Sequence, residues 1–154
     1  LYEEGLTKEV EAVFHRATNV GFAAGINVIL PYTDLKTDRS CRFVDNNATV
    51  ITWNGEVCPC YRLLHPCQEI VFKRNKRLLQ KSFGSIKEKT LEEIWTSPEY
   101  MKFRYNVQNS LYPSCTDCDL VVDCDLVVDS ELDCMGNSPA CGDCLCARGI
   151  IHCP

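Results

Sequence analysis

The chain has 154 residues and a formal net charge of −5 at pH 7, so we expect one domain with a modest core and no surface that binds nucleic acid across the whole molecule. No stretch approaches the roughly 18 consecutive apolar residues of a membrane span, and the N-terminus lacks the basic segment and apolar run of an export signal. The sequence therefore predicts a cytoplasmic protein without a membrane or nucleic-acid partner.

The first forty residues predict a helix followed by a strand. Thr7 is a suitable N-cap for a helix that continues to about Val20, because apolar residues recur there at helical spacing, and Gly21 or Gly25 would end it. The apolar run at residues 26–30 has strand character. A helix and then a strand are typical of the last unit of an α/β layer.

The segment ATVITWNGEVCPC predicts a β-hairpin. Asn54 and Gly55 would supply the two positive-φ positions of a type I′ turn between β-rich flanks. Because the strands of a hairpin are antiparallel, the turn should also bring Cys58 and Cys60 back towards Cys41, which lies just upstream.

Residues 62–89 form a basic segment that contains eight Lys or Arg against two Glu, most densely from Lys73 to Lys81. We expect a solvated loop, or alternatively a docking patch for an acidic partner. Both interpretations place the basic side chains on the surface.

Two short helices are predicted next. Thr90 and Glu93 form a capping box, and Ser97 followed by Pro98 predicts a second start, with serine as the cap and proline at the first helical position. The aromatic residues of this region are most simply core residues: Trp95, Tyr100 and Phe103.

Eight of the twelve cysteines lie in a tail between Cys115 and Cys153, a density that no apolar core requires. They include two C-x-x-C pairs, which let two sulfurs converge on one metal centre. The tail repeats the sequence CDLVVD, and the second copy runs into Ser130 where a cysteine would be expected. Eight acidic residues against one base leave the tail little apolar content with which to order itself, so a metal centre is the expected organiser.

The residues alone leave three interpretations of these cysteines open. Iron–sulfur clusters take four thiolates each, from C-x-x-C pairs and more distant cysteines. Structural zinc could be closed by the two pairs, but it leaves too many cysteines unexplained. A disulfide framework would use all twelve but needs an oxidising compartment that nothing in the sequence indicates. His15, His65 and His152 are minor candidates, because thiols are not scarce.

The cysteine spacing also resembles a known signature. It runs in this order: Cys41, thirteen residues, Gly55, four residues, Cys60, a gap, Cys115, two residues, Cys118, five residues and Cys124. This order is similar to that of the SPASM domain, the C-terminal extension of many radical SAM enzymes, and FGSIKEKTLEEIWTSPEYMKFR resembles the helical insert of that family. The ending CMGNSPACGDCLCARGIIHCP is similar to a subgroup of radical SAM proteins that includes maturases of tungsten-cofactor oxidoreductases.

The resemblance implies two auxiliary 4Fe-4S clusters, the first bound by Cys41 and Cys60. The second would be bound by the tail cysteines Cys115, Cys118 and Cys124. The family usually places another cysteine four residues beyond the last of these, where this chain has Val128, and we expect Cys134 to replace it. The sets would be completed by these residues: Cys153 and one or both of Cys141 and Cys144.

These assignments give nine candidates for eight places, so at least one is surplus. The cysteines expected to remain unligated are Cys58, Cys67 and Cys146. Five aspartates lie beside the candidate ligands, where they would either oppose the addition of an electron or be solvated surface: Asp117, Asp119, Asp123, Asp125 and Asp143.

The predicted fold is α+β, a small hairpin with short helices and an irregular cysteine-rich tail organised by metal clusters. Residues 1–40 resemble the helix–strand end of a radical SAM barrel, and residues 41–154 resemble the auxiliary-cluster domain. The chain begins with Leu1 and not with methionine, so we expect a further domain upstream.

The expected function is that of an auxiliary cluster domain. It would transfer electrons, or position a peptide or protein substrate, for an upstream radical SAM domain. No C-x-x-x-C-x-x-C motif occurs in the chain, so it should not cleave S-adenosylmethionine alone. The alternative is a zinc-stabilised module that docks a partner through the basic segment.

Overall fold

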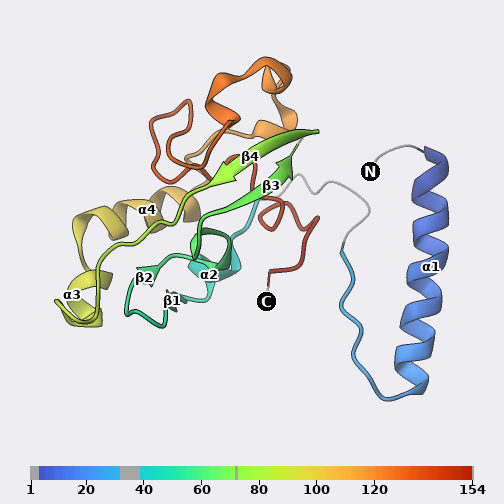
Figure 1. Cartoon of the computed structure of the whole chain (residues 1–154). Helices are drawn as coiled ribbons and strands as arrows, with labels where there is room; N and C mark the ends of the chain where they lie inside the picture. The colour runs from blue at the N-terminus through green and yellow to red at the C-terminus, as the bar shows by residue number, and fades with distance from the viewer. Residues whose placement is uncertain (1–3, 32–38, 72, 154) are drawn as a thin grey trace. The chain divides into compact units, whose positions relative to one another are not determined.

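A computed structural model describes residues 4–31, 39–71 and 73–153 (Figure 1). The chain divides into two units, a larger one of residues 40–144 and a smaller one of residues 1–39 with 145–154. The larger unit contains all the cysteines except Cys146 and Cys153. Mixed short helices and antiparallel hairpins confirm the α+β prediction at this level.

The smaller unit contains helix α1, Glu4–Ala23. The helix is longer than predicted, starting before Thr7, and the chain turns at Gly25, where φ is +69°. The strand predicted at residues 26–30 is wrong, because these residues have no regular secondary structure. A strand needs a ladder partner, and the described residues of this unit supply none. In the parts of the chain that the structure covers, no helix has the length and apolar character to cross a bilayer.

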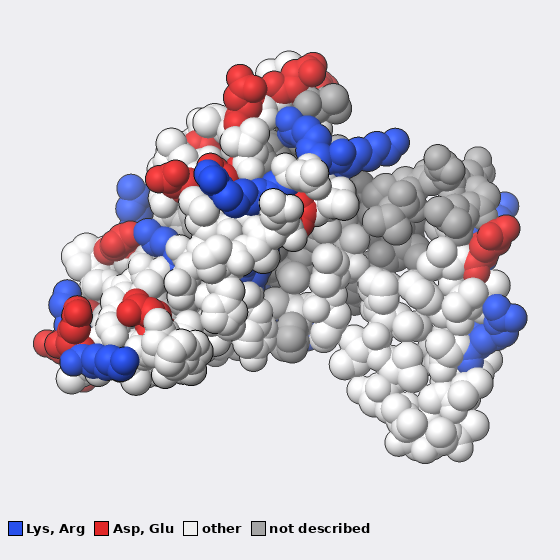
Figure 2. Space-filling model, viewed as in Figure 1, with Lys and Arg blue, Asp and Glu red and all other residues white. Residues whose placement is uncertain are grey.

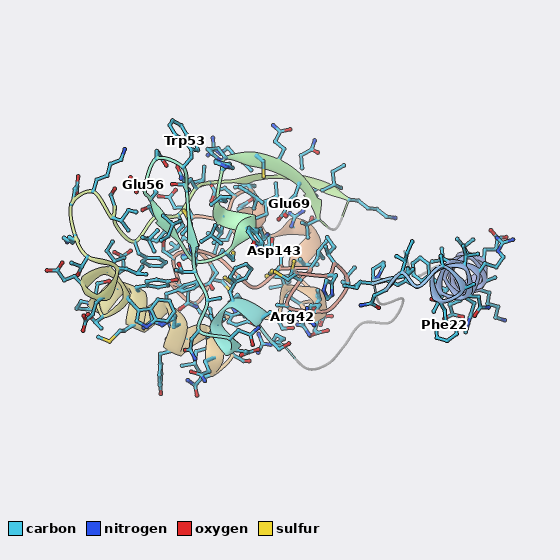
Figure 3. The ribbon with its side chains drawn as sticks, turned by 90° about the horizontal axis from the view of Figure 1, so that it is seen from below. Phe22, Arg42, Trp53, Glu56, Glu69 and Asp143 are labelled. Atoms are coloured by element: carbon cyan, nitrogen blue, oxygen red, sulfur yellow. The ribbon has the colours of Figure 1, made fainter. Side chains whose placement is uncertain are left out.

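The first hairpin of the larger unit is confirmed, but its turn differs from the prediction. Strand β1, Val50–Ile51, pairs antiparallel with β2, Val57–Cys58. Thr52 and Glu56 close a three-residue loop in which Gly55 alone adopts a positive φ, +91°. This is the geometry of a type I turn followed by a left-handed glycine. Trp53 at the tip is 92% exposed (Figure 3).

The loop predicted for the basic segment is wrong, because its densest part is a second hairpin. Strand β3, Cys67–Val71, pairs antiparallel with β4, Arg74–Leu78. Alternate residues of β4 turn inward, so that Lys76 and Leu78 are buried while Arg77 is exposed. Because successive side chains of a strand point to opposite faces, one of the basic side chains, Lys76, points into the larger unit.

The two predicted helices begin where the capping signals place them, α3 at Leu91–Trp95 and α4 at Pro98–Gln108. A further short helix, α2, Arg42–Asp45, was not predicted. The Thr90–Glu93 capping box is formed at the start of α3. Ser97 precedes α4 as predicted, but its hydroxyl donates to the Ile94 carbonyl at 2.7 Å and makes no capping bond.

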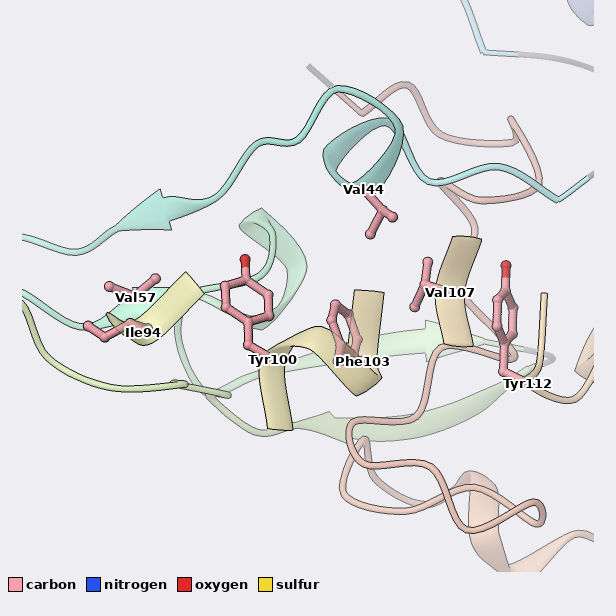
Figure 4. Close-up of a cluster of buried hydrophobic side chains, with 7 residues drawn as sticks. All are labelled: Val44, Val57, Ile94, Tyr100, Phe103, Val107 and Tyr112. Carbon is pink, nitrogen blue, oxygen red and sulfur yellow. The ribbon is translucent and has the colours of Figure 1, made fainter. Parts of the chain in front are cut away.

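The core of the larger unit joins these helices to β2 (Figure 4). Tyr100 and Phe103 are buried in it and Trp95 packs against it, which confirms the predicted aromatic core. The Phe83 ring stacks on Tyr100 with centroids 4.2 Å apart. The buried cluster consists of Val44, Val57, Ile94, Tyr100, Phe103, Val107 and Tyr112.

The tail is irregular, as predicted, with short 3₁₀ turns η2, Cys115–Asp117, η3, Val121–Asp123, and η4, Asp125–Val127. It then runs beside β4, where the Arg77 amide donates to the Val128 carbonyl at 2.9 Å and the Ser130 amide donates to the Arg77 carbonyl at 3.2 Å. The buried Ser130 hydroxyl accepts the Leu79 amide at 2.9 Å. Ser130 therefore holds the tail to the hairpin at the place where the repeat would put a thiol.

Ile94 offers a direct test of the core. It is fully buried, whereas Leu91 in the same helix is 42% exposed. Ile94→Ala should lower the free energy of unfolding by about 2–5 kcal/mol, because it removes buried methylene groups and leaves a cavity. Leu91→Ala should cost no more than about 0.5 kcal/mol. Urea unfolding followed by tryptophan fluorescence measures both, and equal losses would contradict this core.

Candidate metal centre

Four cysteines of the larger unit lie within electrostatic reach of one another, and we call them the first thiol group: Cys41, Cys60, Cys141 and Cys144. Burial raises the pKa of Cys60 to about 12, and the negative charges of Cys144 and Cys41 add to the rise. Burial also raises the pKa of Cys141 well above its usual value, with Cys144 and Cys60 adding to it. Such thiols hold their protons at neutral pH until a cation replaces them.

The first thiol group is anchored on the hydrophobic core. Cys41 is the residue before α2, and Cys60 follows β2 and precedes the 3₁₀ turn η1, Tyr61–Leu63. The backbone amides of Leu63 and Arg62 hydrogen bond to the Cys60 sulfur and oppose the rise in its pKa. Cys41 and Cys141 pack against the buried cluster. The predicted approach of Cys60 to Cys41 is therefore formed.

A second set of cysteines comes from the tail, and we call it the second thiol group: Cys115, Cys118, Cys124 and Cys134. Cys115, Cys124 and Cys134 line one pocket. Burial raises the pKa of Cys115 to about 11, and the negative charges of Cys134 and Cys124 contribute to the rise. Cys118 belongs to the same turn as Cys115, to whose carbonyl its amide donates at 3.4 Å, and it is exposed.

The loop that carries Cys134 is shaped by a residue that sequence reasoning missed. The buried carboxylate of Asp133 accepts from the amides of Met135 and Asn137, both at 2.9 Å, and from the Asn137 side chain. An aspartate that bonds the backbone two residues on is a turn signal that could have been read from the sequence. Val128, where the family usually has a cysteine, is 58% exposed.

The two thiol groups meet at Gly142, a second missed residue. Its carbonyl accepts the Cys115 amide at 3.1 Å. A Cβ at this position would lie 2.6 Å from the Pro113 carbonyl oxygen and 2.8 Å from the Cys115 sulfur. Only glycine lets the C-x-x-C loop of the first group pass so close to a sulfur of the second.

Asp143, in the same loop, is not solvated. It is 1% exposed, and Arg62 donates to its Oδ1 at 3.0 Å while Lys76 donates to its Oδ2. Arg62 also pairs with Glu69. Burial opposes charge on the Arg62 guanidinium, but Glu69 and the negative charges of Cys144 and Asp143 raise its pKa above the usual value. The solvated alternative is therefore wrong for Asp143, whereas the other four aspartates are exposed.

The basic segment thus faces the acidic tail of the same chain. Arg74 donates to the Cys124 carbonyl at 3.1 Å and to the Val121 carbonyl, and Arg77 pairs with Asp129 at 3.5 Å. On the face drawn in Figure 2, basic and acidic side chains are interspersed over this region. The solvated-loop prediction is therefore wrong for Arg62, Arg74 and Lys76, whereas Lys73 and Arg77 are exposed.

The remaining cysteines are Cys58 and Cys67 in the larger unit and Cys146 and Cys153 in the smaller one. Cys58 is buried and its pKa is raised by burial and by the charge of Glu56, while Cys67 is exposed on β3. Cys146 and Cys153 belong to the smaller unit. His15 and His65 are exposed.

The thiol geometry also bears on the disulfide and zinc interpretations. No disulfide joins cysteines within the described residues. Nor do three or more Cys, His, Asp or Glu side chains of that part of the chain converge closely enough for a single ion. A single zinc holds its sulfurs at about 2.3 Å, whereas a cluster spreads its thiolates over separate irons.

Comparison with known proteins gives two matches. Residues 41–119 match the model of the SPASM family, described as an iron-sulfur cluster-binding domain. The chain is 51% identical over 130 residues to the tungsten-containing aldehyde ferredoxin oxidoreductase cofactor-modifying protein of Pyrococcus furiosus. The aligned part covers 84% of this chain and 36% of that protein, so the chain spans about a third of its relative. No solved structure matches the chain.

Gly142→Ala tests the contact between the thiol groups. The added methyl group should displace Cys115 or the loop 141–144. The iron bound per purified chain should then fall by about half or more, because candidate ligands lie on both sides of this contact. Gly136→Ala adds the same methyl where nothing lies within 4 Å, at a strain of about 1–2 kcal/mol from its positive φ. Anaerobic iron analysis of both should find iron lost only from Gly142→Ala; undiminished iron there would refute the close approach.

Proposed function

The chain belongs to the SPASM family of iron–sulfur cluster-binding domains, as its cysteine spacing predicted, and on that basis we propose that it binds two 4Fe-4S clusters, one at each thiol group. The observation that carries the proposal is the separation of cysteines from distant parts of the chain into two sets. A thiolate set of four matches the ligand requirement of one such cluster.

The proposal assigns a full set of ligands to each cluster. The first cluster takes Cys41, Cys60, Cys141 and Cys144, and the second takes Cys115, Cys118, Cys124 and Cys134. This grouping uses eight of the nine candidates and leaves out Cys153. It is supported by the mutual electrostatic effects within the first group and by the pocket that three members of the second group line.

The protein groups around each site suit redox chemistry. A bound cluster of this type gains or loses one electron, at a potential set by nearby charges and by hydrogen bonds to its sulfurs. The amides of Arg62 and Leu63 point hydrogen-bond donors at Cys60, and the core behind Cys41 and Cys141 keeps water from that side. The second group lies in the acidic tail, whose exposed aspartates disfavour an added electron.

We propose that the chain acts within a longer radical SAM protein. The relative is named as a cofactor-modifying protein for a tungsten-containing aldehyde ferredoxin oxidoreductase, and it extends well beyond the part that aligns here. The SAM-cleaving motif does not occur in this sequence, and our proposal assigns that chemistry to an upstream domain. The auxiliary clusters would then carry electrons to or from that domain, or position a peptide or protein substrate during maturation of the tungsten enzyme.

The zinc-stabilised docking module is less well supported. It relies on a basic segment free to meet a partner, but Arg62, Arg74 and Lys76 make their contacts inside the larger unit. Metal analysis of the purified chain separates the two functions.

Iron content tests the two-cluster assignment. Anaerobically prepared chain should be brown, with acid-labile sulfide and about eight irons. The double variants Cys41→Ala/Cys60→Ala and Cys124→Ala/Cys134→Ala should each retain about four irons, because each empties one site. Cys67→Ala/Cys146→Ala removes as many thiols outside the proposed sets and should retain about eight. A colourless chain with stoichiometric zinc would instead establish the docking module's metal.

Cys153 provides a test of the grouping itself. Cys153→Ala should keep about eight irons and an unchanged electron paramagnetic resonance spectrum of the reduced chain. Loss of about four irons would show that Cys153 is a ligand and that one member of the thiol groups is not.

A further inference from the structure

The buried network of Arg62, Asp143 and Lys76 lies where the two thiol groups meet. Lys76 and Asp143 are 2% and 1% exposed. Both oxygens of the Asp143 carboxylate are occupied, one by each cation. Arg62, which is partly buried and also pairs with Glu69, thus joins Asp143 and Lys76 in a single hydrogen-bonded chain.

Each cation of the network faces a different thiol group. Lys76 lines the pocket of Cys115, Cys124 and Cys134, and its charge lowers the pKa of Cys115. Arg62 lies instead beside the first thiol group. It follows Cys60 by two residues, its amide hydrogen bonds to the Cys60 sulfur, and its charge lowers the pKa of Cys141.

Asp143 faces both groups. It belongs to the C-x-x-C loop of the first thiol group, between Cys141 and Cys144, and it also lines the pocket of the second. Its charge adds to the raised pKa of Cys115. One carboxylate is therefore shared by the two cations and by both sites.

Stability alone is a weak reason for such an arrangement. Desolvation of buried ions commonly cancels their attraction, and apolar residues of similar volume are often at least as stabilising. Buried charges do act strongly on neighbouring charges, because the interior screens them poorly. A cluster with four thiolates is such a neighbour, and its charge changes when it gains an electron.

We propose that Arg62, Asp143 and Lys76 set the reduction potentials of both clusters. Arg62 raises chiefly the potential of the first cluster, Lys76 raises chiefly that of the second, and Asp143 lowers both. These are tuning residues, which act through charge and ligate no iron. The inference rests on the proposed function, since it requires a cluster at each thiol group.

The experiment removes one charge at a time from the iron-loaded chain. Lys76→Gln and Arg62→Gln keep a donor for Asp143 but lose the positive charge, and Asp143→Asn loses the negative charge at equal size. Arg77→Met is the matched control, because Arg77 follows Lys76 in β4 but its side chain is 67% exposed. Potentials are read from dithionite titrations by electron paramagnetic resonance, and the double cysteine variants that keep one cluster assign each signal.

The expected pattern has opposite signs and a site preference. Lys76→Gln lowers the second potential more than the first, Arg62→Gln lowers the first more than the second, and Asp143→Asn raises both. Arg77→Met moves neither. The charge-keeping variants Lys76→Arg and Arg62→Lys should restore potentials close to those of the unaltered chain.

Potentials that stay unchanged in variants with full iron content would overturn the inference and leave the network a structural role. Should a glutamine variant lose iron, Asp143→Asn still decides the question, because both of its potentials must rise or the inference fails. An unaltered chain without iron would overturn the proposed function itself, which keeps the two failures distinct.

Discussion

The contact between the loop 141–144 and the rest of the larger unit is the constraint on which this structure depends. Gly142 lets the loop pass against the Cys115 sulfur, and Asp143 fixes it to Arg62 and to strand β4. Cys141, at its start, packs on the core. Four successive residues thereby join the apolar core, the basic hairpin and the acidic tail, and they place Cys141 and Cys144 next to Cys115 of the second thiol group.

The acidic tail is ordered by its contacts with the basic hairpin β3–β4. A tail with one base and eight acids has little apolar surface to order it. Arg74 supplies donors to two of its carbonyls, and the backbone of β4 pairs with Val128 and Ser130. These bonds hold the tail beside β4 near the second thiol group without a helix or a long strand.

Local signals in the sequence predicted the local structure. The capping box at Thr90, the proline start of α4 and the first hairpin all depend on residues within a few positions, and each is formed. The predictions failed where distant partners decide. Nothing near Lys76 in the sequence indicates that its counter-ion is Asp143, and the apolar run at residues 26–30 has no strand to pair with in the described part of its unit. The cysteine spacing predicted the family, but the division into groups required the fold.

The ligands of the proposed first cluster come from both ends of the larger unit, since Cys41 is its second residue and Cys144 its last. Bringing such distant residues together costs conformational entropy of the chain, and metal–thiolate bonds would offset that cost. During synthesis, the early thiols would emerge from the ribosome long before their partners. Insertion of that cluster would therefore be a late event of biogenesis, because a nascent chain interrupted before the loop would hold only two of its four ligands.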